Sequence, residues 1–245
     1  MFNLFKKQDI HIVRLTSQRR LEQALAKTGV ENLASVTKLV VYGVMDKADF
    51  KHIRKRMSTT LQELDMFNAL FEGDKLRNGA LARCVALTSV VLPNSIVAIG
   101  DSAFSNCSNL PSITIPKTVS KIGELAFWGC TALTSIEIPD SVSTLAFRTF
   151  NNCTALTSIT LPNTLVKIGG SVFGRCMALS SITIPNSVEE IGNGIFAHCT
   201  ALTSITIPES VTKIGEWVFE DCEAFVTVHG DNPVYTSENG KLVVK

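Results

Sequence analysis

The stretch Cys130–Asn152, CTALTSIEIPDSVSTLAFRTFNN, is one copy of a unit that repeats through most of the chain. Three residue types recur at a spacing of 23 residues. Cysteine occupies positions 84, 107, 130, 153, 176, 199 and 222, proline 93, 116, 139, 162, 185 and 208, and phenylalanine 104, 127, 150, 173, 196 and 219. A fixed period of this length predicts a solenoid in which stacked copies of one unit bury a shared core.

Within the quoted unit, the apolar residues are expected to face the interior. Leu133, Ile136 and Ile138 point inward from a short strand in this interpretation. Pro139 ends the strand, because proline cannot donate a hydrogen bond to the ladder. Phe150 then fills the centre of the turn, and the following cysteine opens the next unit.

Most copies carry the dipeptide Ile-Gly after the proline turn, as in Ile122-Gly123. We expect this glycine to serve a tight bend or a positive φ angle, both of which glycine adopts readily. The quoted copy has Ala146 at the same place, so a positive φ is there either not required or locally strained.

All seven cysteines share one position of the unit. An odd number excludes a complete set of intrachain disulfides, and stacked units would hold the thiols parallel, which suits packing better than bridging. There is no CxxC pair, and the four histidines are scattered. We therefore expect free, buried thiols that pack as small apolar groups, with no metal site and no cofactor.

The first 83 residues show the same apolar spacing in longer units. Triplets of apolar residues with the spacing LxxLxL start at positions 10, 36, 61 and 87. The first triplet places Ile10 inside. Ser17 is expected to cap a helix that ends near Lys27, and Asp46 a second helix with apolar residues on its inner face. Residues 67–83 are expected to be irregular. This pattern predicts an N-terminal capping region made of helix-backed turns of the same solenoid.

The last residues predict a different cap. The segment Tyr235–Val244, YTSENGKLVV, places Asn-Gly between two β-prone runs, which is a strong signal for a two-residue β-hairpin. We therefore divide the chain into an N-terminal capping region (1–83), regular repeats (84–229) and a C-terminal β-hairpin cap (230–245).

Charge is distributed unevenly along the chain. Residues 1–83 carry 15 basic and 9 acidic side chains, whereas residues 84–245 carry 8 and 13. Lys51, Arg54, Lys55 and Arg56 lie on one predicted helix face, which is either simply solvated or directed at an anionic surface. No aromatic residues alternate with these charges, so no nucleic-acid partner is expected. No apolar run is long enough to span a membrane, and no secretory leader is recognisable, so the localisation stays open.

The unit C-x2-L-x2-I-x-I-P-x-S-V-x2-I-G-x2-A-F-x2 resembles the BspA-like, or Treponema pallidum-type, leucine-rich repeats. Leu110–Phe127 (LPSITIPKTVSKIGELAF) and Leu202–Phe219 (LTSITIPESVTKIGEWVF) carry the pattern, and the resemblance covers about residues 84–229. It implies an α/β repeat solenoid, a right-handed leucine-rich-repeat superhelix. Proteins of that family are typically exposed on host-associated bacteria and some parasitic protists, and are associated with adhesion. The resemblance supplies no catalytic residues.

Positions that vary between copies are candidates for partner binding, because the scaffold does not dictate them. They lie after Ile-Gly and between phenylalanine and cysteine. The candidate partner-binding residues are Trp128, Phe147, Arg148, Arg175, His198 and Trp217. Aromatic residues and arginine are enriched at interface hot spots. The alternative is that the aromatic side chains fold onto the solenoid edge as additional packing.

The outward positions of the repeat strands are nearly all hydroxyl residues. The candidate sheet-face ladder consists of Ser135, Ser158, Thr160, Ser181, Thr183, Ser204 and Thr206. Hydroxyl pairs of this kind are typical of a solvated β surface. The alternative is a flat face that contacts a protein, a glycan or ice. Glu137 interrupts the array.

Catalytic signatures such as GxSxG, GxxxxGK[ST], HExxH and GxGxxG are absent from the sequence. The sequence therefore predicts a non-enzymatic protein-binding module, with adhesion to a host or cell-surface protein as the leading hypothesis and a glycan as a possible partner. The alternative is a structural repeat domain without a ligand of its own.

Overall fold

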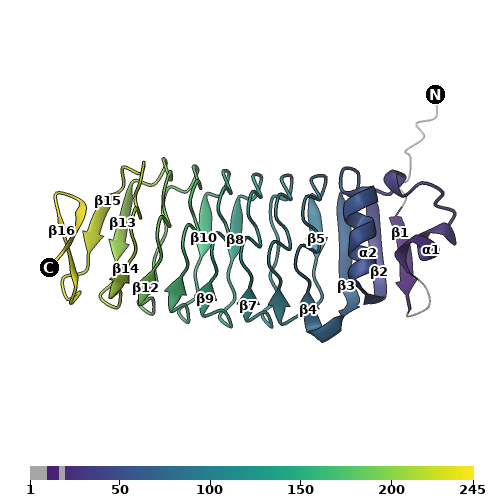
Figure 1. Cartoon of the computed structure of the whole chain (residues 1–245), viewed down its shortest axis with the longest axis horizontal. Helices are drawn as coiled ribbons and strands as arrows, with labels where there is room; N and C mark the ends of the chain where they lie inside the picture. Colours follow the sequence, from purple (N-terminus) through teal and green to yellow (C-terminus); the bar gives the residue numbers. More distant parts are fainter. Residues whose placement is uncertain (1–9, 17–19) are drawn as a thin grey trace, which may run out of the picture.

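Two ladders of short parallel strands run along an elongated solenoid (Figure 1). The computed structural model describes residues 10–16 and 20–245. The first ladder begins as a four-stranded sheet of β1 (Ile10–Leu15), β2 (Lys38–Met45), β3 (Glu63–Phe71) and β5 (Ser89–Val91). It continues as two parallel pairs, β8 (Ser135–Glu137) with β10 (Ser158–Thr160) and β13 (Ser204–Ile207) with β15 (Phe225–Val228).

The second ladder is a seven-stranded sheet on another side of the solenoid (Figure 1). Its strands are β4 (Lys75–Leu76), β6 (Ala98–Ile99), β7 (Lys121–Ile122), β9 (Thr144–Leu145), β11 (Lys167–Ile168), β12 (Glu190–Ile191) and β14 (Lys213–Ile214). The sequence analysis gave each unit only one strand and missed this sheet. A two-residue strand is too short to show the alternation that reveals strands in a sequence.

The glycine of the Ile-Gly dipeptide follows five of the seven strands of the second ladder, and the exceptions are β4, followed by Arg77, and β9, followed by Ala146. The φ angle of this glycine is not positive, so that alternative was wrong. The glycine instead lets successive turns approach closely. A Cβ on Gly192 would lie 2.5 Å from the backbone nitrogen of Gly170, and a Cβ on Gly169 would lie 2.8 Å from the carbonyl oxygen of Leu145. Ala146 shows that one turn accommodates a methyl group without a positive φ.

A stack of phenylalanine rings forms the centre of the core, as predicted. The fully buried members are Phe104, Phe127, Phe150, Phe173 and Phe196. Successive ring centroids, including that of Phe219, lie 5.2 to 6.1 Å apart, and the ring planes differ by 3 to 14°. Each ring thus packs mainly against the same residue of the turns above and below.

Six of the seven cysteines are buried free thiols, which confirms the predicted packing role, and Cys222 is half-buried. The structure adds a hydrogen bond that the sequence did not reveal. The Sγ of Cys130 donates to the carbonyl oxygen of Phe104 at 3.2 Å, and that of Cys153 donates to Phe127 at 3.2 Å. Burial raises the pKa of the Cys130 thiol to about 12.

The cysteines should therefore differ sharply in reactivity, because the thiolate is the reactive form and only one thiol is accessible. Partial burial also raises the pKa of Cys222, so we expect a thiol reagent at pH 8 to modify Cys222 faster than the six buried thiols in the folded protein, and all seven cysteines after denaturation. Mass spectrometry of the alkylated protein measures this, and Cys222→Ser should abolish the fast phase. Rapid native modification of Cys130 would contradict the packing described above.

The N-terminal turns are backed by helices, as expected. They are α1 (Leu21–Ala26), the 3-10 turn η1 (Leu33–Ser35), α2 (Lys47–His52) and the π-helical turn η2 (Ile53–Met57). None of the helices in the described ranges is long and apolar enough to cross a membrane. Asp46 caps α2 by accepting hydrogen bonds from the backbone N–H groups of Ala48 and Asp49, so this predicted cap is confirmed.

The N-terminal region differs from the sequence prediction in two places, and a third prediction is untested because the proposed cap Ser17 lies outside the described residues. Ile10 is 57% exposed rather than inward, because alternation along β1 places it on the face opposite Val13 and Leu15. It pairs with Lys38 and not with Val36, so the first apolar triplet is out of register with the second. The segment expected to be irregular begins with five residues of β3, which extends to Phe71 before the 3-10 turn η3 (Glu72–Asp74).

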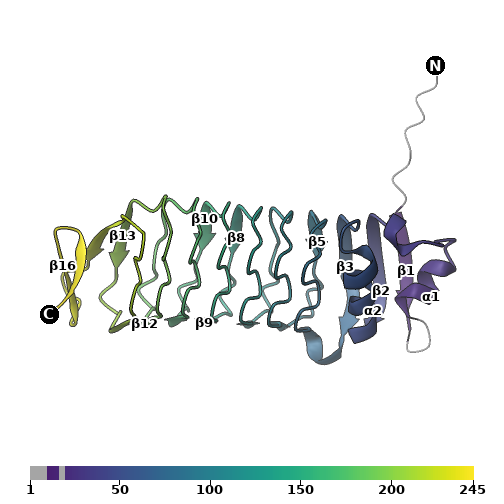
Figure 2. The same cartoon turned by 45° about the horizontal axis from the view of Figure 1, so that its top comes forward.

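The C-terminal end is closed by the predicted hairpin (Figure 2). The strands β16 (Tyr235–Glu238) and β17 (Lys241–Val244) pair antiparallel. Asn239 and Gly240 have φ angles of 51° and 74°, as a type I′ turn requires. The hairpin joins the solenoid through two hydrogen bonds, from the N–H of Val226 to the carbonyl of Gly240 and from the N–H of Ile214 to the hydroxyl of Tyr235, each 2.9 Å.

Candidate functional site

Four of the six candidate partner-binding residues have a left-handed backbone conformation. In each regular turn, two positions between the second strand and the next cysteine have positive φ angles. One position is held by Ser102, Leu125, Arg148, Ser171, Gly194 and Trp217 in successive turns, and the other by Arg83, Asn106, Gly129, Asn152, Arg175, His198 and Asp221. Because glycine fills two of these places, the turn itself needs no side chain there.

The structure brings three of the candidates onto neighbouring turns. The N–H groups of Leu125 and Phe127 donate to the carbonyls of Phe147 and Thr149, so Trp128 lies beside the turn that carries Phe147 and Arg148. We call Trp128, Phe147 and Arg148 the edge cluster. These residues follow the second ladder and lie away from the sheet face of β8 and β10.

Phe147 and Arg148 form the exposed part of the edge cluster. The Phe147 side chain is 42% exposed, and the guanidinium carbon of Arg148 lies 4.8 Å from its ring centroid, in cation–π geometry. Trp128 is half-buried, and its Nε1–H donates to the Asn151 side chain at 3.2 Å. Trp128 thus contributes to packing as well as to the surface, whereas Phe147 and Arg148 face solvent.

The remaining candidates lie nearer the C-terminal end. Trp217 is 66% exposed, so the packing alternative does not describe it. It is three turns from Arg148, or about 14 Å at the usual strand spacing. Arg175 is exposed, and the Nδ1 of His198 lies 3.1 Å from a carboxylate oxygen of Asp221. The six candidates therefore follow one edge of the solenoid without forming a single compact cluster.

The hydroxyl columns lie on the exposed face of the first ladder. Ser135 pairs with Ser158 and Glu137 with Thr160, whereas Ser181 and Thr183 lie in a segment that does not pair as a strand. The remaining members of the columns, Ser204 and Thr206, are exposed on β13.

A groove of about 870 Å³ follows this face and its adjoining turns. It is lined by Ser112, Thr114, Ser135, Glu137, Ser158 and Thr160 among others. The sequence analysis identified the columns but not the groove, because the groove depends on how the proline turns project beyond the strands. Glu137 places one carboxylate among the hydroxyl groups of its floor.

These observations define a leucine-rich repeat solenoid with an exposed aromatic and arginine edge. A family model described as "BspA type Leucine rich repeat region" matches residues 74–200 and 167–240 in six copies. The match covers more than half of the chain, so the protein belongs to the BspA-type leucine-rich repeat family. Repeats of this kind are protein-interaction modules.

Solved structures of several bacterial proteins are similar to this chain, and the first two are leucine-rich repeat proteins. One from T. pallidum is 30% identical, with 53% of this chain and 57% of that chain covered and a TM-score of 0.41. One from Eubacterium ventriosum is 26% identical, with 62% and 37% covered and a TM-score of 0.46. The pneumococcal vaccine antigen PcpA is 19% identical, with 80% and 57% covered and a TM-score of 0.45.

The chain thus spans about half or less of the length of the first two structures. No curated protein matches it.

Proposed function

We propose that this chain is a non-enzymatic module of adhesion type that binds a host or cell-surface protein through its edge cluster. The observation that carries the proposal is the exposed Phe147 ring with the Arg148 guanidinium held against it. Phenylalanine and arginine are both enriched in protein interfaces, and arginine also among the few hot-spot residues that carry most of the binding energy. A contact between the two side chains also lowers the entropy lost when a partner immobilises them.

The choice of arginine at position 148 supports the same surface. Its left-handed conformation recurs at the same place in the other regular turns, so the conformation belongs to the fold. A non-glycine residue in the left-handed region costs about 1–2 kcal/mol. Glycine occupies the equivalent position at Gly194, so folding does not require an arginine side chain here.

The proposal is tested with the double variant Phe147→Ser/Arg148→Gly. The purified chain is screened by surface plasmon resonance against a panel of extracellular-matrix and cell-surface proteins. For any partner found, we expect the variant to weaken binding by about 100-fold, the effect of losing two hot-spot residues. Its thermal midpoint should be unchanged or higher, because glycine relieves the left-handed conformation.

The matched control is Met177→Ser/Arg83→Gly. Met177 is 43% exposed, close to the value for Phe147, and Arg83 has a φ of 63° against 55° for Arg148. The control should bind as the parent protein does. Equal weakening in both variants would overturn the edge assignment. Binding that survives in the edge variant but is lost on Glu137→Lys would assign recognition to the sheet-face groove, and binding to no partner would favour a structural repeat domain.

A further inference from the structure

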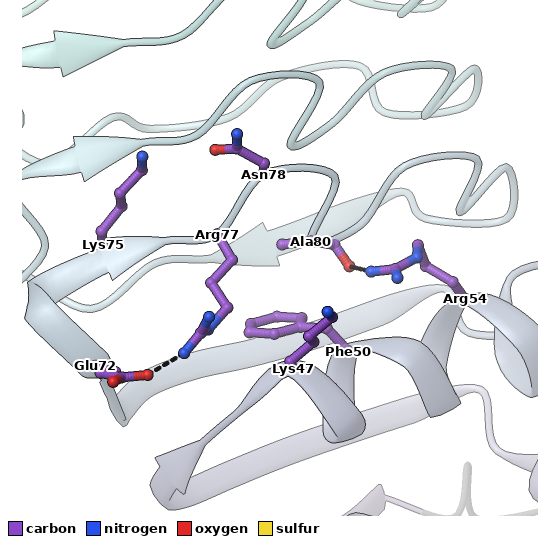
Figure 3. A pocket seen from close by; sticks show the side chains of 8 residues that line it. All are labelled: Lys47, Phe50, Arg54, Glu72, Lys75, Arg77, Asn78 and Ala80. Carbon is purple, nitrogen blue, oxygen red and sulfur yellow. Dashed lines mark hydrogen bonds and ion pairs between the residues drawn. The ribbon is translucent and has the colours of Figure 1, made fainter.

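A cationic pocket lies in the N-terminal part of the molecule, separate from the edge cluster and from the sheet-face groove (Figure 3). Its volume is about 560 Å³, within the range of about 300–1,000 Å³ typical of small-molecule sites. Four cationic side chains line it: Lys47 and Arg54 from the α2–η2 helix, and Lys75 and Arg77 from β4 and the turn after it. Glu72 is its one carboxylate.

Arg54 is held in place by the backbone on the far side of the pocket. One guanidinium nitrogen, Nη1, donates to the carbonyl oxygens of Gly79 at 2.8 Å and Ala80 at 3.0 Å, and the side chain is half-buried. In Figure 3 it reaches from the helix to the Ala80 turn. The sequence analysis placed Arg54 on one basic face with Lys51, Lys55 and Arg56. The structure separates Arg54 from these three exposed residues and turns it into the pocket.

The charges in the pocket are not balanced. Four cations against one carboxylate leave three positive charges, and Glu72 pairs with Arg77 in an exposed ion pair. Like charges that converge in a cleft repel one another and attract an anion. The nearby Asn78 amide is already engaged, since it donates to the Asp101 carboxylate at 2.8 Å. Recognition in this pocket therefore depends on the lysine and arginine side chains.

Phe50 lies at the base of the pocket between the charged groups, and its ring is only 2% exposed (Figure 3). The pocket is much larger than one oxyanion, so it has room for the body of a ligand beside an anionic group. Guanidinium groups match the oxygens of a phosphate group in a two-pronged geometry, and lysine adds point charges.

We propose that this pocket binds a small molecule that carries a phosphate group. The phosphate lies between Arg77, Lys47 and the free edge of Arg54, and the organic part fills the remaining volume of the pocket. The site is independent of the edge cluster, because none of its residues contributes to that surface.

The proposal is tested by isothermal titration calorimetry of the full chain at low ionic strength. The probes are glucose 6-phosphate, inorganic phosphate and glucose. We expect one equivalent of glucose 6-phosphate to bind, inorganic phosphate to bind more weakly and glucose not to bind. Equal affinity for both phosphates would retain the phosphate site but assign its ligand as the free ion. Failure of both phosphates to bind would overturn the proposal.

The variant Lys47→Gln/Arg77→Gln should weaken glucose 6-phosphate binding by about 100-fold, roughly ten-fold for each lost cation. Arg54 is left intact, because its removal would leave the Ala80 carbonyl without a donor and the Gly79 carbonyl with only the Ala82 N–H. The control Lys51→Gln/Arg56→Gln removes the same charge from the exposed helix face and should leave the affinity within about two-fold of the parent value. Equal loss in both variants would overturn the assignment to the pocket.

A gain-of-affinity variant makes the test independent of folding defects. Glu72→Gln frees Arg77 and raises the net charge of the pocket, so glucose 6-phosphate should bind several-fold more tightly. Glu238→Gln makes the same charge change at an exposed site of β16, at the other end of the solenoid (Figure 1), and should have no effect. Unchanged affinity in Glu72→Gln would contradict the role given to Arg77.

Discussion

Phe150→Ala is expected to lower the free energy of unfolding by about 3–5 kcal/mol, the usual cost of removing a buried phenylalanine. Phe150 is fully buried, and its ring stacks at 5.4 Å on Phe127 and at 6.1 Å on Phe173. In a solenoid, each turn is stabilised only by its neighbours. Removing the ring leaves a cavity that weakens the packing of this turn against both of its neighbours at once. Phe127 and Phe173 already pack in their own turns, so no ring is available to fill the cavity.

Urea denaturation followed by circular dichroism measures the loss. Phe147→Ala is the matched control, because it removes the same side chain three residues earlier from an exposed site. The control should change the free energy by less than about 1 kcal/mol. Equal destabilisation by the two substitutions would show that the stack does not form the centre of the core.

The repeat architecture could be predicted because each residue type that recurs every 23 positions has a single structural role. Phe150 and Cys153 both repeat every 23 residues and are both fully buried. The Asn239-Gly240 turn was equally readable, since only a few residue types tolerate two successive positive φ angles. These features depend on local chemistry that each residue brings with it.

The second ladder could not be predicted in the same way. Its strands contain only two residues, and their pairing, such as Ile168 with Ile191, exists only between turns. The role of the glycine in Ile-Gly was mispredicted for the same reason. Gly192 is required by the backbone of the preceding turn, and that contact is not visible within one unit. The recurring Ile-Gly dipeptide was the available signal for this pairing.

The candidate site was predicted in outline only. Variation between copies identified Arg148 and Trp217, but their left-handed conformation was not foreseen, because nothing in these side chains requires it. Their role in binding stays a prediction. The boundary at residue 83 also stays a prediction, since β3 pairs with β5 across it in one continuous sheet. The pocket was missed because Arg54 and Arg77 are far apart in sequence.

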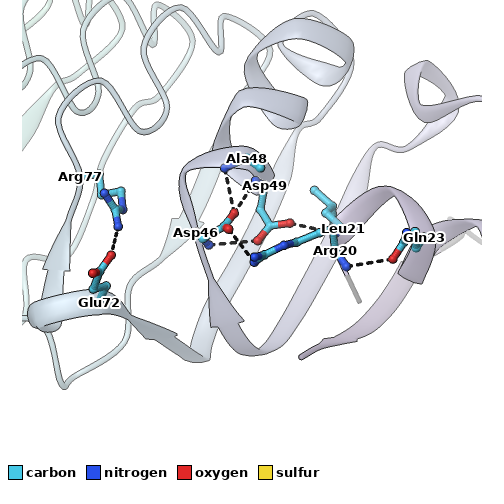
Figure 4. Close-up of polar contacts among 8 residues, drawn as sticks. All are labelled: Arg20, Leu21, Gln23, Asp46, Ala48, Asp49, Glu72 and Arg77. Carbon is cyan, nitrogen blue, oxygen red and sulfur yellow. Dashed lines mark hydrogen bonds and ion pairs between the residues drawn. The ribbon is translucent and has the colours of Figure 1, made fainter. Parts of the chain in front are cut away.

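Asp49→Ala is expected to lower the free energy of unfolding by about 2–4 kcal/mol, because it leaves two backbone donors without an acceptor. The Asp49 carboxylate is completely buried. It accepts from the N–H of Leu21 at 2.8 Å and from the N–H of Asp46 at 3.0 Å (Figure 4). Burial raises the pKa of Asp49, and these hydrogen bonds oppose the rise. One side chain thus joins the starts of α1 and α2.

Asp49→Asn separates the geometry of this link from its charge. The amide keeps one acceptor oxygen, so we expect an intermediate loss of about 1–2 kcal/mol. Asp46→Ala removes only the half-buried cap and its ion pair with Arg20, and should cost about 1 kcal/mol. The three variants are compared by urea denaturation and by hydrogen exchange at the Leu21 amide. A protected Leu21 amide in Asp49→Ala would contradict the bridging role, whereas exchange confined to α1 and α2 would show that the cap opens before the repeats.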